Sequence, residues 1–333
     1  MAILSSNVAT LSDIAKRIDP DGKIQAIVEL LKQNNSILDG MLWKEGNLPT
    51  GHRTTVRTGL PTITARRLNE GVTPSKSTTA QIDEQCAMLE AISECDVDLV
   101  RLNGNDSGFR LSEAGAFVEA MNQSMAQYLF YGNGNTTPEA FTGFAPRYNS
   151  LSGTIAQNVL SGPNPSGSSD NTSVWLIVWG ENTIHGIYPK GSKAGLTHED
   201  LGEQLIQTGT GIGTGRMKAF VDRWQWKCGL AVRDWRYAVR IANINVGNLV
   251  AESSAADLTK LMIKAIHRIP ALGSGRAVFY CNRTVREMLD IQALTKAGNQ
   301  LSIDNFDGKP ITKFRGIPIE TVDQILETEA AVV

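Results

Sequence analysis

The sequence predicts an α+β protein. Stretches with the two-residue alternation of strands and stretches with the three-to-four-residue spacing of helices follow one another along 333 residues, without a regular β-α-β repeat. This length corresponds to about two domains at roughly 150 residues each. Since 41% of the residues are hydrophobic, the chain can bury an ordinary core. A disordered or fibrous chain is therefore excluded.

The composition also excludes several function classes. The chain carries 32 basic against 34 acidic residues, so a net charge of −2 argues against wrapping nucleic acid by bulk charge. The longest apolar run, Val174–Trp179, is far shorter than the roughly 20 residues of a membrane-spanning helix. The four cysteines and four histidines lack zinc-site spacing, so we expect no metal and reduced thiols. The first residues lack signal-peptide features, and we expect an intracellular product.

Two short amphipathic helices are expected near the N-terminus. Apolar residues repeat at helical spacing over Leu11–Ile18, which Pro20 ends, and again over Ile24–Leu31. Each stripe is too small to be buried on the other. Two solutions stay open, an arm that docks elsewhere or the first layer of a domain.

Residues 46–104 favour extended structure, because glycine and proline interrupt threonine-rich stretches. The candidate strands are His52–Thr58, Thr62–Leu68 and a returning segment, Thr79–Leu102. Residues 52–76 hold five basic residues and one acidic residue, a net charge of +4, whereas residues 81–98 hold six acidic residues and no basic one. The two arms could pair with each other in a hairpin, or with the opposite arms of a neighbouring copy.

The clearest helix of the chain is expected over Ser112–Tyr131, with Ser112 as N-cap and Gly132 as stop. About 20 helical residues span roughly 30 Å. The further expected elements are an exposed loop over 161–173, strands at Val174–Trp179, Ile184–Tyr188 and Ala277–Cys281, alternating segments at Phe220–Cys228 and Leu230–Ile241, helices at Asp257–Arg268 and Thr284–Leu294, and a strand-like end, Ile311–Thr321.

The glycine-rich stretch Gly209–Gly215 does not fit a nucleotide-binding loop. Arg216 and Met217 follow it instead of Gly-Lys-Ser/Thr, and Leu201–Gln207 before it lacks a strand pattern. A flexible loop is therefore favoured. His198–Asp200 is expected to be a polar turn rather than part of a nucleophile-base pair, and His185 and His267 to be packing or surface residues. No catalytic, cofactor-binding or metal-binding residue is predicted.

Residues 216–240 combine seven basic residues with three tryptophans, which invites a nucleic-acid interpretation. However, Trp224, Trp226 and Cys228 alternate on one face of a candidate strand, as residues of a sheet core do. We favour core packing, with the basic residues on a solvated or subunit-contacting face.

Several blocks carry a family resemblance. They are Gly46–Pro61 (GNLPTGHRTTVRTGLP), Phe130–Asn133 (FYGN), Phe141–Tyr148 (FTGFAPRY), Trp179–Gly191 (WGENTIHGIYPKG) and the stretch Phe306–Pro318. In these blocks the sequence resembles the major capsid proteins of short-tailed bacteriophages of the epsilon15 kind. The blocks are spread over most of the chain.

The resemblance implies the Hong-Kong-97-like capsid fold, with an N-terminal arm, an extended β-hairpin loop, a peripheral domain with a long spine helix, and an axial domain. The elements expected above fit this order. The implied boundaries are 1–45 for the arm, 46–104 for the extended loop, 105–140 and about 215–270 for the peripheral domain with its spine helix at 112–131, and about 141–214 and 271–333 for the axial domain.

The implied function is structural and not enzymatic. The chain would assemble into hexamers and pentamers of an icosahedral phage head around double-stranded DNA, in the host cytoplasm and then in the virion. Implied partners are scaffolding, decoration and portal proteins, with non-specific contact to DNA at most and none to membrane; no cofactor and no covalent cross-link between subunits are expected. The candidate intersubunit contacts are Arg53, Arg57, Arg66, Arg67, Glu90, Glu94, Asp96 and Asp98.

Two alternatives remain beside this function. One is the shell protein of an encapsulin-like nanocompartment, which would share the fold. The other is a nucleotide-binding enzyme that uses the loop Gly209–Gly215.

Overall fold

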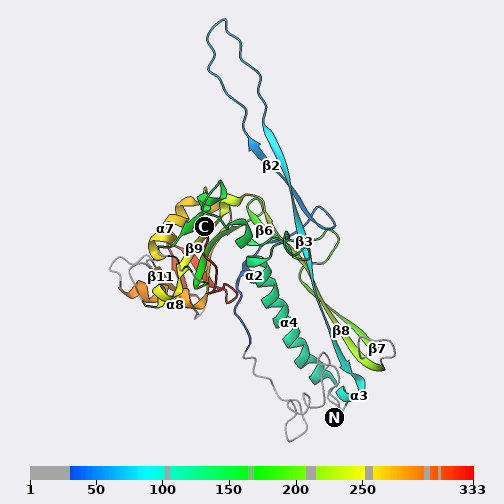
Figure 1. Ribbon diagram of the computed structural model, residues 1–333. Helices are drawn as coiled ribbons and strands as arrows, with labels where there is room; N and C mark the ends of the chain where they lie inside the picture. The colour runs from blue at the N-terminus through cyan, green and yellow to red at the C-terminus, as the bar shows by residue number, and fades with distance from the viewer. Residues whose placement is uncertain are drawn as a thin grey trace. The chain divides into compact units, whose positions relative to one another are not determined.

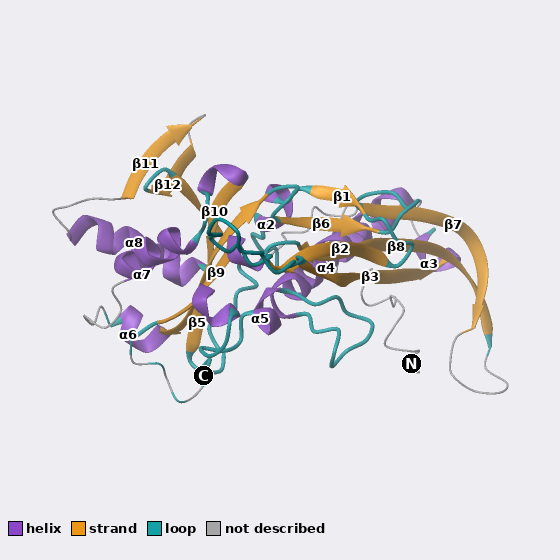
Figure 2. Ribbon diagram, turned by 90° about the horizontal axis from the view of Figure 1, so that it is seen from above, coloured by secondary structure: helices purple, strands orange, loops and turns teal. Residues whose placement is uncertain are grey.

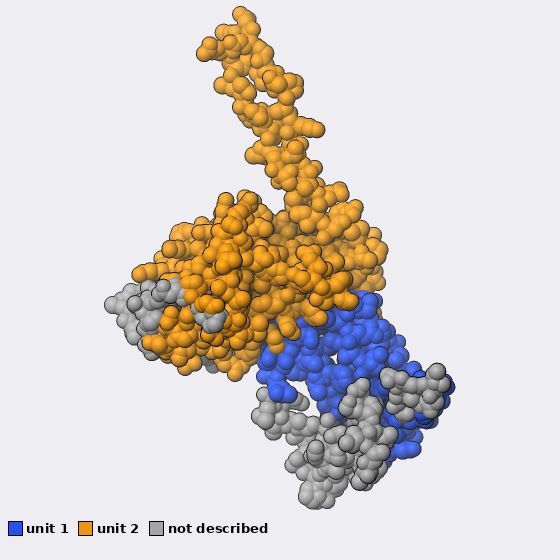
Figure 3. Space-filling model, in the orientation of Figure 1, with its two compact units in different colours: residues 1–35, 88–126, 195–227 blue, residues 36–87, 127–194, 228–333 orange. Residues whose placement is uncertain are grey.

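A computed structural model describes residues 31–101, 106–163, 165, 167, 169–207, 215–251, 258–295, 301–306 and 309–333. The chain divides into two compact units (Figure 3). Unit 1 comprises residues 1–35, 88–126 and 195–227, and unit 2 comprises residues 36–87, 127–194 and 228–333. Both expected helices that precede residue 31, and residues 209–214 of the glycine-rich loop, lie outside the described residues.

Unit 2 contains a mixed sheet built around β5 (Asn171–Trp179). Antiparallel partners flank β5 on both sides, β9 (Ala238–Asn245) and β10 (Arg276–Cys281). Beyond β10 the sheet continues through β13 (Ile317–Thr321), β12 (Lys309–Phe314) and β11 (Leu301–Phe306). Further strands are β4 (Val159–Ser161) beside β9, β6 (Ile184–Tyr188) beside β5, and β1 (Trp43–Glu45) parallel to β6. Residues 229–232 at the end of β8 (Arg216–Val232) pair antiparallel with β6.

Both faces of this sheet are covered, and all nine residues of β5 are buried. Val174, Leu176 and Val178 belong to a core cluster shared with α6 (Val246–Val250), α7 (Leu258–Arg268) and α8 (Arg283–Thr295), which Figure 2 shows beside β9 and β10. The ring of Trp175, which points to the opposite face, packs against Phe130 and Phe144 at centroid distances of 6.0 and 5.7 Å. Burial on both faces explains why β5 is continuously apolar over Val174–Trp179.

The remaining short helices of unit 2 are α2 (Ile37–Gly40), α5 (Phe144–Arg147) and the 3₁₀ turns Ile155–Asn158, Trp235–Tyr237 and Leu272–Ser274. The domain boundaries implied by the resemblance stay a prediction. The compact units divide the chain at other positions, and α7 and β9 share one core with β5 and β10.

A long antiparallel hairpin is formed by β2 (Gly51–Gly59) and β3 (Thr78–Asp96), as predicted (Figure 1). The ladder joins β2 to residues Thr78–Gln85 of β3. The prediction of a strand at Thr62–Leu68 is wrong, because residues 60–77 have no strand partner despite their high β-propensity. The return strand ends at Asp96, short of Leu102, since the Asp96 carboxylate accepts a hydrogen bond from the amide of Asp98 and begins α3 (Val97–Val100).

Unit 1 contains the hairpin of β7 (Leu196–Gln207) and β8 (Arg216–Val232), which pair as far as Trp226. The expectations that Leu201–Gln207 is not a strand and that His198–Asp200 is a turn are therefore wrong. A bulge between Asp200 and Glu203, with Gly202 at a φ of +71°, interrupts the alternation that marks a strand. The unit also holds the first 21 residues of α4 (Asp106–Tyr131) and a small core of Cys95, Val100 and Phe109.

Most other elements confirm the prediction. Helix α4 ends at Tyr131 but begins six residues before Ser112, and α7, α8, β5, β6 and β10 cover their expected positions. Leu230–Ile241 is not one segment, because Asp234 caps a 3₁₀ turn between β8 and β9. The expected strand Ile311–Thr321 is divided by Arg315 and Gly316, both at positive φ. Trp224 and Cys228 are buried and Trp226 is half-buried, which confirms core packing for the first two.

Candidate assembly surfaces

The hairpin root, residues 51–54 and 82–86, is held in unit 2 by a buried ion pair. Arg147 donates two hydrogen bonds to the Glu84 carboxylate, of 2.7 and 2.5 Å, and the Glu84 side chain is only 8% exposed. The same guanidinium donates to the carbonyl oxygens of Thr142 and Gly143. Next to Glu84, the Gln85 side chain donates to the carbonyl of Ala140 at 2.8 Å. The block Phe141–Tyr148 therefore positions the root of the hairpin.

Two glycines let this block approach α4. The amide of Gly143 donates to the carbonyl of Gly132 at 2.8 Å, so the two backbones run in direct contact. A Cβ on Gly132 would lie 2.6 Å from the carbonyl oxygens of Phe141 and Tyr128. A Cβ on Gly143 would lie 2.5 Å from those of Leu129 and Tyr128. Only glycine fits at both positions.

The hairpin tip, residues 57–77, is exposed almost throughout. Its side chains include Leu60, Ile63 and Leu68, which are 79, 90 and 92% exposed. Single exposed apolar residues are ordinary, but several on one projecting segment mark a contact surface. Arg57, Arg66 and Arg67 are exposed on the same segment, and none of them forms an ion pair with any described part of the chain. The tip is thus both apolar and basic.

Among the described residues, Arg53 is the one basic candidate of the four that has an acidic partner. Its guanidinium donates to both carboxylate oxygens of Asp83, the residue opposite it in the ladder, at 2.6 and 2.7 Å. These hydrogen bonds hold the pKa of the Asp83 carboxyl below its ordinary value. The pair is half exposed, so solvent screens it and its main effect is to fix register.

The four acidic candidates lie on the part of β3 beyond Gln85, where the ladder with β2 ends, and on α3. Glu90 accepts hydrogen bonds from Arg223, at 2.7 and 3.0 Å, and from Gln225, which lower its pKa. Asp96 caps α3. Glu94 is half-buried and Asp98 is exposed. The hairpin ladder therefore brings none of these acids opposite the basic residues of β2.

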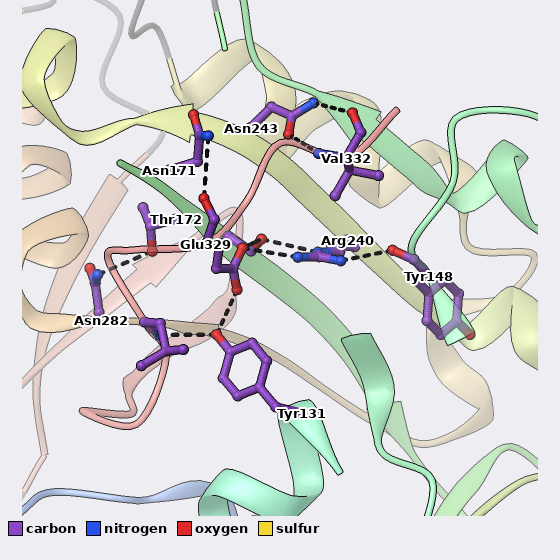
Figure 4. A network of polar contacts seen from close by, with 11 residues as sticks. Tyr131, Tyr148, Asn171, Thr172, Arg240, Asn243, Asn282, Glu329 and Val332 are labelled. Carbon is purple, nitrogen blue, oxygen red and sulfur yellow. Dashed lines mark hydrogen bonds and ion pairs between the residues drawn. The ribbon is translucent and has the colours of Figure 1, made fainter. Parts of the chain in front are cut away.

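A buried polar network in unit 2, which no sequence pattern indicated, centres on Glu329 (Figure 4). The Glu329 carboxylate accepts hydrogen bonds from Arg240 at 2.9 Å, from Tyr131 at 2.6 Å and from Ser173. Arg240 also donates to the carbonyl of Tyr148 and lies over the ring of Trp175. Both charged side chains are only 5% exposed. Burial is the main cause that raises the pKa of Tyr131, so its hydroxyl stays a donor.

The same network holds the last residues of the chain. Backbone groups of Glu329 and Asn171 exchange hydrogen bonds, and the Asn243 side chain both donates to and accepts from the backbone of Val332 (Figure 4). The amide of Leu151 donates to the carbonyl of Val333. The C-terminal segment is thus a structural strap on the sheet of unit 2.

Unit 1 carries a surface groove of about 280 Å³ between α4, β7 and β8. In it Arg110 bridges Asp222 and Asp200, while His198 stacks on Trp224 and contacts Asp222 at 2.9 Å. Among the residues that the structure describes, no serine, threonine or cysteine lines this groove. Its charged groups act as an ion-pair lock between a helix and a hairpin.

Within the described residues, no group of three or more histidine, cysteine or acidic side chains is arranged to hold a metal ion. None of the helices in the described ranges has the length and hydropathy to cross a membrane.

Comparisons with known proteins agree with these features. The family model described as major capsid protein GP7 matches residues 19–333. The structure matches that of bacteriophage Epsilon15 with 36% sequence identity and a TM-score of 0.78, covering 100% of this chain and 99% of that one. No curated protein sequence matches.

Two further structures are less similar. The capsid of bacteriophage JBD30 matches at 9% identity and a TM-score of 0.49, over 97% of this chain and 99% of that chain. The capsid of a native GTA particle matches at 9% identity and a TM-score of 0.45, over 72% and 99%.

The match to Epsilon15 confirms the predicted α+β, Hong-Kong-97-like capsid fold. The role is a structural one in the shell of a virion, and neither alternative function is favoured. With the family model matched over nearly the whole chain, the protein belongs to the GP7 family of phage major capsid proteins.

Proposed function

We propose that this capsid protein assembles into the hexamers and pentamers of an icosahedral head that encloses double-stranded DNA, and that the hairpin tip joins neighbouring subunits. The observation that carries the proposal is the exposure of Leu60, Ile63 and Leu68 on one projecting segment. A shell needs the same surface to meet a different surface of the next copy, as in any heterologous contact. The tip has the composition of such a surface.

The charges of the tip indicate which surface of the neighbouring subunit it contacts. Arg57, Arg66 and Arg67 have no acidic partner among the described residues, and Glu94 and Asp98 have no basic one. We assign the basic tip of one subunit to the acidic end of β3 and α3 in its neighbour, together with Asp96. Exposed ion pairs contribute only about 0–1 kcal/mol each, so they set register. Apolar burial, at about 25 cal/mol per Å², supplies most of the energy.

The test is a charge swap, in which the basic set and the acidic set are reversed separately and then together in one chain. Replacement of Arg57, Arg66 and Arg67 by Glu is expected to abolish closed particles, because like charges would then meet at the contact. Replacement of Glu94 and Asp98 by Lys is expected to do the same, and Asp96 is left in place because its carboxylate caps α3. A chain that carries both sets of changes should regain particles, seen by negative-stain electron microscopy and sedimentation velocity.

Two controls accompany the swap. Lys264→Glu makes one charge reversal of the same kind at an exposed residue of α7 and should leave assembly intact. Circular dichroism should show unchanged unfolding of every variant, because the substituted side chains of the tip make no internal ion pair. Failure of the combined variant to assemble, while each subunit stays folded, would refute the pairing.

Three finer points belong to the same proposal. The chain would act without catalysis, would be assembled in the host cytoplasm, and would contact packaged DNA non-specifically at most. Scaffolding, decoration and portal proteins would be its other partners. Electron microscopy of particles purified from infected cells, together with identification of the proteins and nucleic acid that they contain, tests all of these.

A further inference from the structure

Two histidines meet inside unit 2 at the hairpin root. His52 lies on β2 and His185 on β6, and their rings stand edge to face with centroids 5.6 Å apart. His185 is fully buried and His52 is 9% exposed. The ring-to-ring contact is therefore a direct link between the hairpin and the sheet of unit 2.

Most nitrogens of this pair have no hydrogen-bond partner in the described chain. They are Nδ1 of His52 and both Nδ1 and Nε2 of His185. A neutral imidazole has one donor and one acceptor, and burial of either without a partner costs about 1–3 kcal/mol. Neither ring contributes a core contact that an apolar side chain could not make. An orphaned polar pair in the core therefore requires another explanation than packing.

The charged groups around the pair oppose its protonation. Lys44 on β1 and Arg233 after β8 place positive charge near both rings. The two acids that act in the opposite sense are already engaged, Glu84 of β3 by Arg147 and Glu181 of the β5–β6 turn by Lys44. Two imidazolium ions at this separation would also repel each other.

Backbone hydrogen bonds also join β6 to Leu42 and Gly46, on either side of β1. The amide of Gly186 donates to the carbonyl of Leu42, and the amide of Gly46 donates to the carbonyl of Tyr188, both at 2.8 Å. The ring of Trp43 packs over Gly186, where a Cβ would lie 2.7 Å from it. Any separation of the two histidines must disturb these contacts first.

We propose that His52 and His185 form an acid-sensitive latch, in which two neutral rings let residues 41–54 pack on β6 and protonation of either ring releases that packing. The β2–β3 ladder itself carries no part of the latch. Acidification therefore loosens residues 41–54 from β6 without melting the sheet around β5, while the ion pair of Arg147 and Glu84 still holds β3. The latch belongs to the single subunit and does not depend on the intersubunit contacts proposed above.

The sign of the pH dependence follows from burial. Burial is the largest cause that lowers the pKa of both rings, and the pKa of His185 falls from 6.5 to about 4. In the open form the two imidazoles have their ordinary pKa, so they bind protons at a pH at which the closed form leaves them neutral. Closure is thus complete above pH 6.5 and weakens as the pH falls toward 4, by up to about tenfold per pH unit for each ring.

Hydrogen exchange of the full-length, unassembled chain tests the latch. Peptides that contain the amides of Gly46 and Gly186 should lose protection by about tenfold between pH 6.5 and 5.5, after correction for intrinsic rates, while β5 and β10 stay protected. The double variant His52→Gln/His185→Gln should lose this pH dependence. His267→Gln, an exposed histidine of α7, is the matched control and should keep it.

A second measurement does not depend on folding of the double variant. The chain has four histidines, so His198→Gln/His267→Gln leaves only the proposed latch. Nuclear magnetic resonance of imidazole-labelled protein should then show two rings that titrate below 6.5. The latch is overturned if either ring titrates normally in the folded protein, or if acid exposes β5 and β10 together with the root.

Discussion

At the scale of single residues, the buried ion pair of Arg240 and Glu329 holds the C-terminal segment on the sheet of unit 2. Removal of two charges from water costs several kcal/mol per ion, which only good geometry and further hydrogen bonds can offset. Here Tyr131 and Ser173 supply those bonds to Glu329, and the carbonyl of Tyr148 accepts one from Arg240. Both charged groups therefore have further hydrogen-bond partners, and loss of the ion pair should lower the stability of the whole sheet.

Replacement of Glu329 by Gln is expected to destabilise the subunit by about 3–5 kcal/mol, because it leaves the Arg240 charge buried without a counter-charge. Urea unfolding followed by tryptophan fluorescence measures this loss. The matched control is Asp83→Asn, which breaks the half-exposed pair with Arg53 and should leave the urea midpoint nearly unchanged. Equal losses in the two variants would contradict a special role for the buried pair.

At the scale of elements, the crossing of α4 by residues 141–147 depends on Gly132 and Gly143. Replacement of Gly143 by Ala should force the backbone apart, with a loss of about 1–3 kcal/mol typical of overpacking. Because the same segment carries Arg147, the grip on Glu84 should weaken as well, and thermal unfolding should begin at the hairpin root. Gly273→Ala, where a Cβ would meet no heavy atom within 4 Å, is the control and should be neutral. A neutral Gly143→Ala would show that the crossing is not tight.

Local periodicity predicted the elements whose pattern is unbroken. Helix α4 and strands β5 and β6 were found from spacing alone, and the opposite charges of the two hairpin arms anticipated the pair of Arg53 and Asp83. Strand β7 was missed because its bulge shifts the alternation, and Thr62–Leu68 was overpredicted because propensity cannot supply a partner strand.

The two buried ion pairs left no local trace in the sequence. Glu84 and Arg147 lie 63 residues apart, and Arg240 and Glu329 lie 89 residues apart. Each acid or base looks like an ordinary surface residue within its own stretch of chain. Only the fold brings the partners together, which is why the anchor of the hairpin and the strap at the C-terminus could not be predicted.

At the scale of the whole molecule, the family resemblance predicted the fold and the shell function. It also implies an N-terminal arm, residues 1–45, which we expect to act in assembly. Residues 36–45 are already part of unit 2. Ile37 is fully buried, the Ser36 hydroxyl donates to the carbonyl of Thr321, and β1 pairs with β6. An experiment on the arm must therefore leave these residues in place.

Deletion of residues 1–30 is expected to preserve the folded subunit and to abolish closed particles, if the apolar stripes at Leu11–Ile18 and Ile24–Leu31 dock on neighbouring copies. Urea unfolding should give the midpoint of the intact chain, since the described contacts that hold Ile37 and β1 stay in place. Deletion of residues 1–40 is the contrasting variant. It should lose about 2–5 kcal/mol through removal of the buried Ile37 side chain alone. Normal shells from the shorter deletion, seen by negative-stain electron microscopy, would show that assembly does not need the arm.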